Sequence, residues 1–279
     1  MVKKGKTMKK QKAFTLVELL VVISIISLLM AILVPVLAKV RKQAYNAVCK
    51  THLRQWSDLL MLYTNDNDNL LWYEYHIPYS VEGTWMVVLS DLYNDNPEMR
   101  VCPSTKLDYV KSQSFVYGTT FKTWGPGHSL FRPDDYGSYG INHWITQLPR
   151  HDPGWRNHPQ WHWKIASPKG AGRIPMFFDC TWYGTMPYEY NYADSAAGIT
   201  SGAPPESENW SEQQPGNYGE YDMTRVCINR HQRAINIAFM DGSVQKTDLR
   251  DLWTLKWHKA YNTASGPKPN EFPQWLQSL

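Results

Sequence analysis

Histidine and cysteine side chains are the groups in this chain best suited to hold a metal ion. His151, His158 and His162 lie close together, and the last two are four residues apart, a spacing that puts two imidazoles on one face of a helix. Pro159 lies between them and argues against a regular helix. The cysteines lie far apart, and no two have the CxxC spacing of a zinc or redox motif. We therefore predict no metal site and no cofactor.

His231 precedes Asp241-Gly242 by ten residues, which gives the pattern His-x9-Asp-Gly. At about 3.3 Å a residue, an extended chain would hold the two side chains roughly 33 Å apart, and a loop up to residue 233 would not bring them to ligand distance. Ile235 to Phe239 alternates, and Asp241-Gly242 predicts a two-residue type I′ turn. The spacing is therefore expected to fix the register of a hairpin near 231–246 rather than to build a site.

The sequence holds no recognisable catalytic constellation, and it contains no GxSxG, HExxH or P-loop motif. At 43% hydrophobic and 19% charged residues, the chain is not of a disordered type. Residues 1–13 carry six lysines, and without them the net charge of +4 becomes −2, so nucleic acid is not an expected partner. We predict that the protein is not an enzyme.

The N-terminal segment has the features of a membrane-spanning helix. After the lysines, residues 19–38 run without a charge, and a helix of twenty residues spans roughly 30 Å, the thickness of a bilayer core. The lysines predict a cytoplasmic N-terminus and an outward-facing chain from about residue 40. A signal peptide cleaved after Ala38 and a plain membrane anchor both fit, but neither explains Glu18 at the apolar edge.

The string KAFTLVELL, residues 12–20, resembles the processing site of type IV prepilins and type II secretion pseudopilins. In that family a membrane protease cuts after a small residue and methylates the new N-terminus. The resemblance, which covers about residues 8–70, implies cleavage between Ala13 and Phe14. Alanine stands at position 13 where the family usually has glycine, and either Met1 or Met8 is the start. The His-x9-Asp-Gly pattern resembles a C-terminal signature of large proteins with this kind of N-terminus.

Two further residues match the family pattern in the mature chain: Glu18 would be its fifth residue and Pro35 its twenty-second. A buried amine and a buried carboxylate are each costly when unpaired. In a bundle of such helices, Glu18 of one subunit can lie beside the Phe14 amine of the next, and the pair would fix their axial register. Pro35 has no amide hydrogen and is expected to kink or locally unwind the helix.

Beyond Pro35 the sequence predicts an amphipathic stalk. Apolar residues from Cys49 to Tyr63 recur at spacings of three and four, and the run Asn65 to Asn69 is expected to end the helix. That run lacks the glycine and distal glutamate of a calcium loop, so a solvated turn is expected. The outward-facing side favours disulfides. Of three possible pairings we favour Cys49–Cys102, tying stalk to outer domain, and Cys180–Cys227, closing a long loop.

The outer domain reads as short strands and long loops. Residues 183–226 are rich in Gly, Pro, Ser, Asn and Glu and predict a long surface excursion, and Asp248–Lys259 predicts a short amphipathic helix. The thirteen tryptophans are expected to fill the core of a loop-rich domain, although exposed rings could instead stack on sugars.

Together these features predict an α+β, pilin-like protein whose long N-terminal helix packs on a loop-rich antiparallel sheet domain. The expected parts are a leader (1–13), a transmembrane or filament-core helix (14–38), a stalk helix (39–64) and an extracytoplasmic domain (65–279). The resemblance implies a single-pass inner-membrane protein that assembles into a pilus-like or pseudopilus filament. Implied partners are the prepilin peptidase, a membrane platform with its ATPase, and sibling subunits. The alternative is a surface-anchored carbohydrate-binding protein or hydrolase that uses this export signal.

Overall fold

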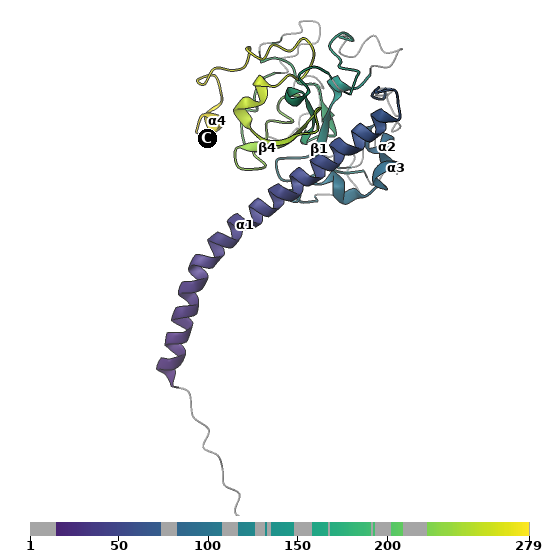
Figure 1. Ribbon diagram of the computed structural model, residues 1–279. Coiled ribbons are helices and arrows are strands. Elements are labelled where there is room, and N and C mark those ends of the chain that lie inside the picture. Colours follow the sequence, from purple (N-terminus) through teal and green to yellow (C-terminus); the bar gives the residue numbers. More distant parts are fainter. Residues whose placement is uncertain are drawn as a thin grey trace, which may run out of the picture. The chain divides into compact units, whose positions relative to one another are not determined.

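The computed structural model describes residues 15–73, 83–107, 117–125, 132, 135–147, 158–166, 168–190, 192, 202–208 and 222–278. The chain forms two compact units, Met1–Ala44 and Tyr45–Leu279. A single helix, α1 (Leu16–Asn65), contributes to both (Figure 1). The predicted architecture of a long N-terminal helix with an α+β domain is confirmed.

The part of α1 in the first unit is apolar and exposed. Its large aliphatic side chains, from Leu16 to Val40, are exposed in the chain by itself. Among the residues that the structure describes, α1 is the one helix long and apolar enough to cross a membrane, judged by length and composition. The helix runs through Pro35 without a break in its helical backbone, so the locally unwound form is not seen.

The part of α1 in the second unit is amphipathic, as predicted. Its buried side chains follow one another at spacings of three and four, namely Cys49, Leu53, Trp56, Leu60 and Thr64, with Ser57 beside them. The helix ends at Asn65, where the Asn-Asp run was expected to end it. There the backbone turns through left-handed residues at Asp68 and Asn69, conformations that these two residue types tolerate.

The second unit is built on a five-stranded sheet of order β3-β1-β2-β4-β5. Strand β1 (Tyr139–Asn142) lies antiparallel to β2 (Pro175–Asp179), which pairs with β4 (Ala234–Phe239), and β4 pairs with β5 (Val244–Asp248). The short strand β3 (Gly184–Thr185) runs parallel to β1. The sheet is therefore mixed, and the prediction of a purely antiparallel sheet is wrong at this edge.

The remaining helices of the described chain are short. They are α2 (Trp85–Val88), α3 (Ser90–Tyr93) and α4 (Gln274–Gln277), with 3-10 turns η1 (Pro97–Arg100), η2 (His143–Ile145), η3 (Ala171–Arg173) and η4 (Leu249–Thr254). The helix predicted over Asp248–Lys259 is thus a shorter 3-10 turn. The Asp248 side chain caps it by accepting from the Arg250 amide.

Large aromatic rings fill the core of the second unit. Six of the described tryptophans are at most 1% exposed: Trp56, Trp85, Trp124, Trp144, Trp253 and Trp257. Their indole N–H groups find backbone acceptors; Trp56 donates to Met99 and Trp85 to Tyr183, each at 2.7 Å. Every described tryptophan is buried or half-buried, which agrees with the core role expected for them.

The surface excursion predicted over residues 183–226 is wrong at both of its described ends. Tyr183, Met186 and Tyr188 are buried on one side, and Met223 and Val226 on the other. The polar composition of the segment misled the prediction, because its few large side chains are the ones that enter the core.

The β4–β5 hairpin is present, but its turn differs from the predicted type. The Gly242 amide donates to the Phe239 carbonyl, and the Phe239 amide donates to Ser243 across a three-residue loop. Gly242 has a φ of +83°, whereas Asp241 is not among the residues with positive φ. A three-residue loop with a left-handed glycine at its last position replaces the type I′ turn. The Asp241 carboxylate instead accepts from the amide and hydroxyl of Ser243.

Candidate functional site

The residues at the start of α1 form a helix cap. The Glu18 carboxylate accepts from the amide and from the hydroxyl of Thr15, each at 2.8 Å, and the Glu18 amide donates back to that hydroxyl at 3.3 Å. This is the reciprocal capping box that a Thr-x-x-Glu sequence forms. Glu18 therefore has a local structural role besides the one expected from the sequence. The predicted cleavage residues, Ala13 and Phe14, lie outside the described residues.

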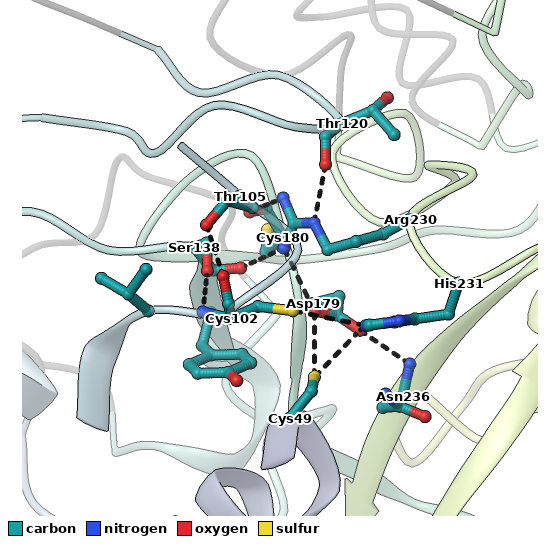
Figure 2. Close-up of polar contacts among 12 residues, drawn as sticks. Cys49, Cys102, Thr105, Thr120, Ser138, Asp179, Cys180, Arg230, His231 and Asn236 are labelled. Carbon is teal, nitrogen blue, oxygen red and sulfur yellow. Dashed lines mark hydrogen bonds and ion pairs between the residues drawn. The ribbon is translucent and has the colours of Figure 1, made fainter. Parts of the chain in front are cut away.

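Three residues singled out from the sequence, Cys49, Cys102 and His231, meet a fourth, Asp179, in the interior of the domain. Cys49 comes from α1, Cys102 from the loop after η1, Asp179 from the end of β2, and His231 from the loop before β4. All four are buried, and one ligand atom of each lies within 4.8 Å of those of the other three. Figure 2 shows the two sulfurs and the imidazole directed at the carboxylate from different sides. We call these four residues the buried cluster.

Short contacts connect the members of the buried cluster. The Cys102 sulfur lies 3.4 Å from His231 Nε2, and this nitrogen lies 3.2 Å from Asp179 Oδ2. The Cys49 sulfur lies 3.5 Å from Asp179 Oδ1 and 3.7 Å from Oδ2. Two thiols, an imidazole and a carboxylate are the side chains that bind soft and borderline transition metals in proteins.

Outer groups hold the Asp179 carboxylate in place. Arg230 Nη1 lies 3.2 Å from Asp179 Oδ1, and the backbone N–H of Asn236 donates to Asp179 Oδ2 at 2.8 Å. Arg230 is itself fixed by backbone carbonyls, among them that of Thr120 at 2.8 Å (Figure 2). On the other side, the Ser138 hydroxyl accepts from the Cys102 amide at 2.6 Å. The cluster thus lies in a pre-formed polar frame inside an otherwise aromatic core.

The charges within the cluster depend on one another. Burial disfavours the Asp179 carboxylate, but the charges of His231 and Arg230 outweigh it and hold the pKa of Asp179 at about 2. Burial likewise disfavours the imidazolium, yet Asp179 raises the pKa of His231 to about 9. For Cys102, burial is outweighed by the Cys49 and His231 hydrogen bonds, which lower its pKa to about 6. For Cys49, burial and then the Cys102 hydrogen bond raise the pKa well above its ordinary value.

A strained turn places His231. The next two residues, Gln232 and Arg233, both have positive φ, at 55° and 64°, and the His231 amide donates to the Ala234 carbonyl at 2.9 Å. Non-glycine residues adopt such angles rarely and at a cost of about 1–3 kcal/mol each. The chain therefore has two consecutive left-handed residues directly after the histidine, which the sequence did not predict.

His231 and Asp241 lie at opposite ends of β4 and do not meet, as the extended-chain estimate predicted. The four cysteines are free thiols in the structure, and all are buried. Cys49 and Cys102 are near neighbours within the cluster. The favoured pairings, Cys49–Cys102 and Cys180–Cys227, stay predictions.

The histidines considered first do not gather into a site among the described residues. His158 stacks on Trp161 with ring centroids 3.8 Å apart and contacts the Tyr192 hydroxyl at 2.9 Å. His162 Nδ1 lies 2.8 Å from the Thr146 carbonyl oxygen. His151 lies outside the described residues.

Sequence reasoning missed Asp179 and Arg230 as partners of the cysteines and His231. Asp179 ends an apolar run and precedes a cysteine, and Arg230 precedes the motif histidine, but neither feature identifies a partner. Cys49 and Asp179 are 130 positions apart, and Cys102 and His231 are 129 apart. Only the fold brings them together.

A comparison with protein-family models matches the N-terminal part of the chain. Residues 8–34 match the family model described as the prokaryotic N-terminal methylation motif. Over 62 residues the chain is 40% identical to the major component of the type IV wide pilus of Thermus thermophilus, a stretch that covers 22% of this chain and 47% of that protein. The chain thus spans about half the length of this relative. No solved structure matches the chain significantly.

These findings confirm the resemblance to type IV pilin-like proteins.

Proposed function

We propose that this protein is a structural subunit of a type IV pilus-like filament or a type II secretion pseudopilus. The observation that carries the proposal is the methylation motif at residues 8–34, which overlaps the first part of a helix long and apolar enough to cross a membrane. In this scheme the chain is exported as a prepilin, cleaved after Ala13 and methylated at Phe14. The helix anchors it in the membrane before assembly and lies in the filament core afterwards.

The exposure of the aliphatic residues in the first unit supports this scheme. Leu28, Ile32 and Val34 are each more than 60% exposed, and such a surface needs either lipid or neighbouring helices around it. Lipid would cover this apolar surface before assembly, and sibling helices would cover it in the filament.

The amphipathic half of α1 supports the second part of the scheme. Its stripe of buried residues, including Leu53, Trp56 and Leu60, packs into the core of the outer unit. One continuous element would therefore belong both to the filament core and to the displayed domain. The partners of the protein would be the prepilin peptidase, an inner-membrane platform acting with an ATPase, and sibling subunits.

The alternative of a surface-anchored sugar-binding protein would need aromatic rings on the surface. In the part of the chain that the structure describes, every tryptophan is buried or half-buried, and the exposed rings, Tyr45, Tyr73 and Phe121, come from three separate segments. The filament subunit is therefore the proposal that the observations favour.

The test is to shear filaments from cells that produce the full chain and to identify the pelleted protein by mass spectrometry. Peptides from residues 45–279 should be found in the fibre pellet. They should disappear from it, while remaining in the membrane fraction, in cells that lack prepilin peptidase. Recovery of the chain from membranes alone, in cells with active peptidase and intact fibres, would contradict the proposal.

A further inference from the structure

We propose that the buried cluster of Cys49, Cys102, Asp179 and His231 is a structural zinc site. The four side chains come from four separate segments, and no two of them are neighbours in the sequence. A site with four protein ligands and no open position is the kind that stabilises a fold rather than catalysing a reaction. The proposal replaces two expectations from the sequence alone, that of no metal and that of a Cys49–Cys102 disulfide.

The distances within the cluster fit a tetrahedral ion. Zinc bonds of about 2.0–2.3 Å place neighbouring ligand atoms about 3.3–3.8 Å apart in a tetrahedron. The sulfur of Cys102 lies 3.4 Å from His231 Nε2, and the sulfur of Cys49 lies 3.7 Å from Asp179 Oδ2, the same oxygen that contacts the histidine. The nitrogen and oxygen of His231 and Asp179 are 3.2 Å apart. Since every pair lies within 4.8 Å, the remaining pairs need to close by roughly 1 Å at most.

The charges of the site balance when zinc is present. Two thiolates and the Asp179 carboxylate carry three negative charges, and a divalent ion with the buried Arg230 guanidinium carries three positive charges. Buried charges are tolerated when they are paired in this way. Arg230 and the Asn236 amide already hold the carboxylate, as outer groups do around metal-binding carboxylates.

A zinc ion would bond to all four side chains of the buried cluster, whereas a disulfide would involve only two. A bond between Cys49 and Cys102 would occupy both sulfurs but would leave His231 and Asp179 as a separate buried pair. A metal ion engages all four side chains and links α1, the loop after η1, β2 and the entry to β4. Cys49 is the first fully buried side chain along α1, so the ion would fix the point at which this helix enters the core.

The first experiment measures metal content. The full chain, carrying no histidine tag, is produced in medium with added zinc and purified in detergent without chelator. We expect inductively coupled plasma mass spectrometry to find one zinc ion per chain. Cys102→Ser should lower this content about tenfold or more. The matched control is Cys227→Ser, which alters a thiol that is equally buried but lies outside the cluster.

A second experiment needs no variant, in case Cys102→Ser does not fold. The unmodified chain is loaded with Co²⁺ in place of zinc, and we expect thiolate-to-cobalt charge-transfer bands together with the intense visible bands of a tetrahedral ion. In the zinc-loaded chain, chelator should make Cys49 and Cys102 reactive to an alkylating reagent, and Cys180 and Cys227 should not change. A Cys49–Cys102 disulfide in the exported protein, free thiols without bound metal, or zinc retained in folded Cys102→Ser would each overturn the proposal.

Discussion

Arg230 shows at the scale of a single residue how polar groups are accommodated in this aromatic core. Its side chain is fully buried, and its guanidinium donates to the carbonyls of Thr119 and Thr120 as well as to the Asp179 carboxylate. A buried ion pair adds little net stability over apolar packing, but removing one partner leaves an uncompensated charge. The integrity of the interior therefore depends on this residue.

Arg230→Met should destabilise the protein by about 3–5 kcal/mol, because it leaves the Asp179 carboxylate without its guanidinium partner. The control is Arg250→Met, which breaks an ion pair with Asp248 whose side chains are 46% and 36% exposed and should cost less than about 1 kcal/mol. Chemical unfolding of the purified full chain, followed by tryptophan fluorescence, measures both. Equal stabilities for the two variants would show that the buried pair is not structurally important.

Glu18 provides the second prediction at this scale, since the structure gives it a helix cap and the proposed function gives it a charged partner in the next subunit. Glu18→Gln keeps a side chain that can complete the capping box but carries no charge. It should be cleaved normally, yet its incorporation into sheared filaments should fall about tenfold or more, because the Phe14 amine would be buried unpaired.

Thr15→Ala is the matched control for Glu18→Gln, because it breaks the cap and keeps the charge. It should cost the helix end only about 1 kcal/mol and should leave incorporation nearly unchanged. If Glu18→Gln assembles normally and Thr15→Ala does not, the cap rather than the charge is what assembly requires.

Contacts between residues that are close in the sequence can be predicted more easily than contacts between residues that are far apart. The Thr15–Glu18 cap is local and can be seen in the printed sequence, although it was not anticipated. The buried cluster was unpredictable because Cys49 and Asp179 are 130 positions apart, and no periodicity links residues at such separations. His231 was singled out, but for its spacing to Asp241 rather than for the partners that it contacts.

At the scale of elements, the β4–β5 hairpin gives the sharpest test. Gly242→Val puts a β-branched residue at a φ of +83°, which should cost about 1–3 kcal/mol. Gly242→Asn should cost less, because asparagine tolerates this region. Gln245→Val introduces the same side chain into strand β5 of the same hairpin, at an exposed position, and should be nearly neutral.

Thermal unfolding of the purified full-length variants measures the order of these effects. We expect Gly242→Val to have a lower melting temperature than either Gly242→Asn or Gln245→Val. If Gly242→Val and Gln245→Val had the same melting temperature, the left-handed backbone at Gly242 would not be what disfavours valine at that position.

The elements that the sequence predicted best are those with a strong local period. The stripe from Cys49 to Leu60 repeats at spacings of three and four residues, and Ile235, Ile237 and Phe239 alternate at a spacing of two. The short parallel strand β3 has no such pattern, since two residues cannot show a period. Asp241-Gly242 marked the turn correctly but not its length, because both loop types accept glycine at positive φ.

At the scale of the whole molecule, the two units differ in what the sequence can reveal. The first is defined by a continuous motif and an apolar run, from which both the family resemblance and a helix long and apolar enough to cross a membrane could be predicted. The second is a loop-rich domain in which many core contacts join distant segments; the Trp85 indole, for example, donates to the Tyr183 carbonyl 98 positions away. Its fold class was predicted, but its sheet order was not.

The central claim, that this chain is processed as a prepilin, is tested most directly by mass spectrometry of the mature N-terminus. The protein is isolated from the membranes of cells that produce prepilin peptidase. Cleavage after Ala13 removes 13 of the 279 residues, so the account predicts a chain of 266 residues that begins with N-methylated Phe14. An N-terminus at Lys39, as left by a signal peptidase, or an uncleaved chain beginning at Met1 or Met8 would contradict it.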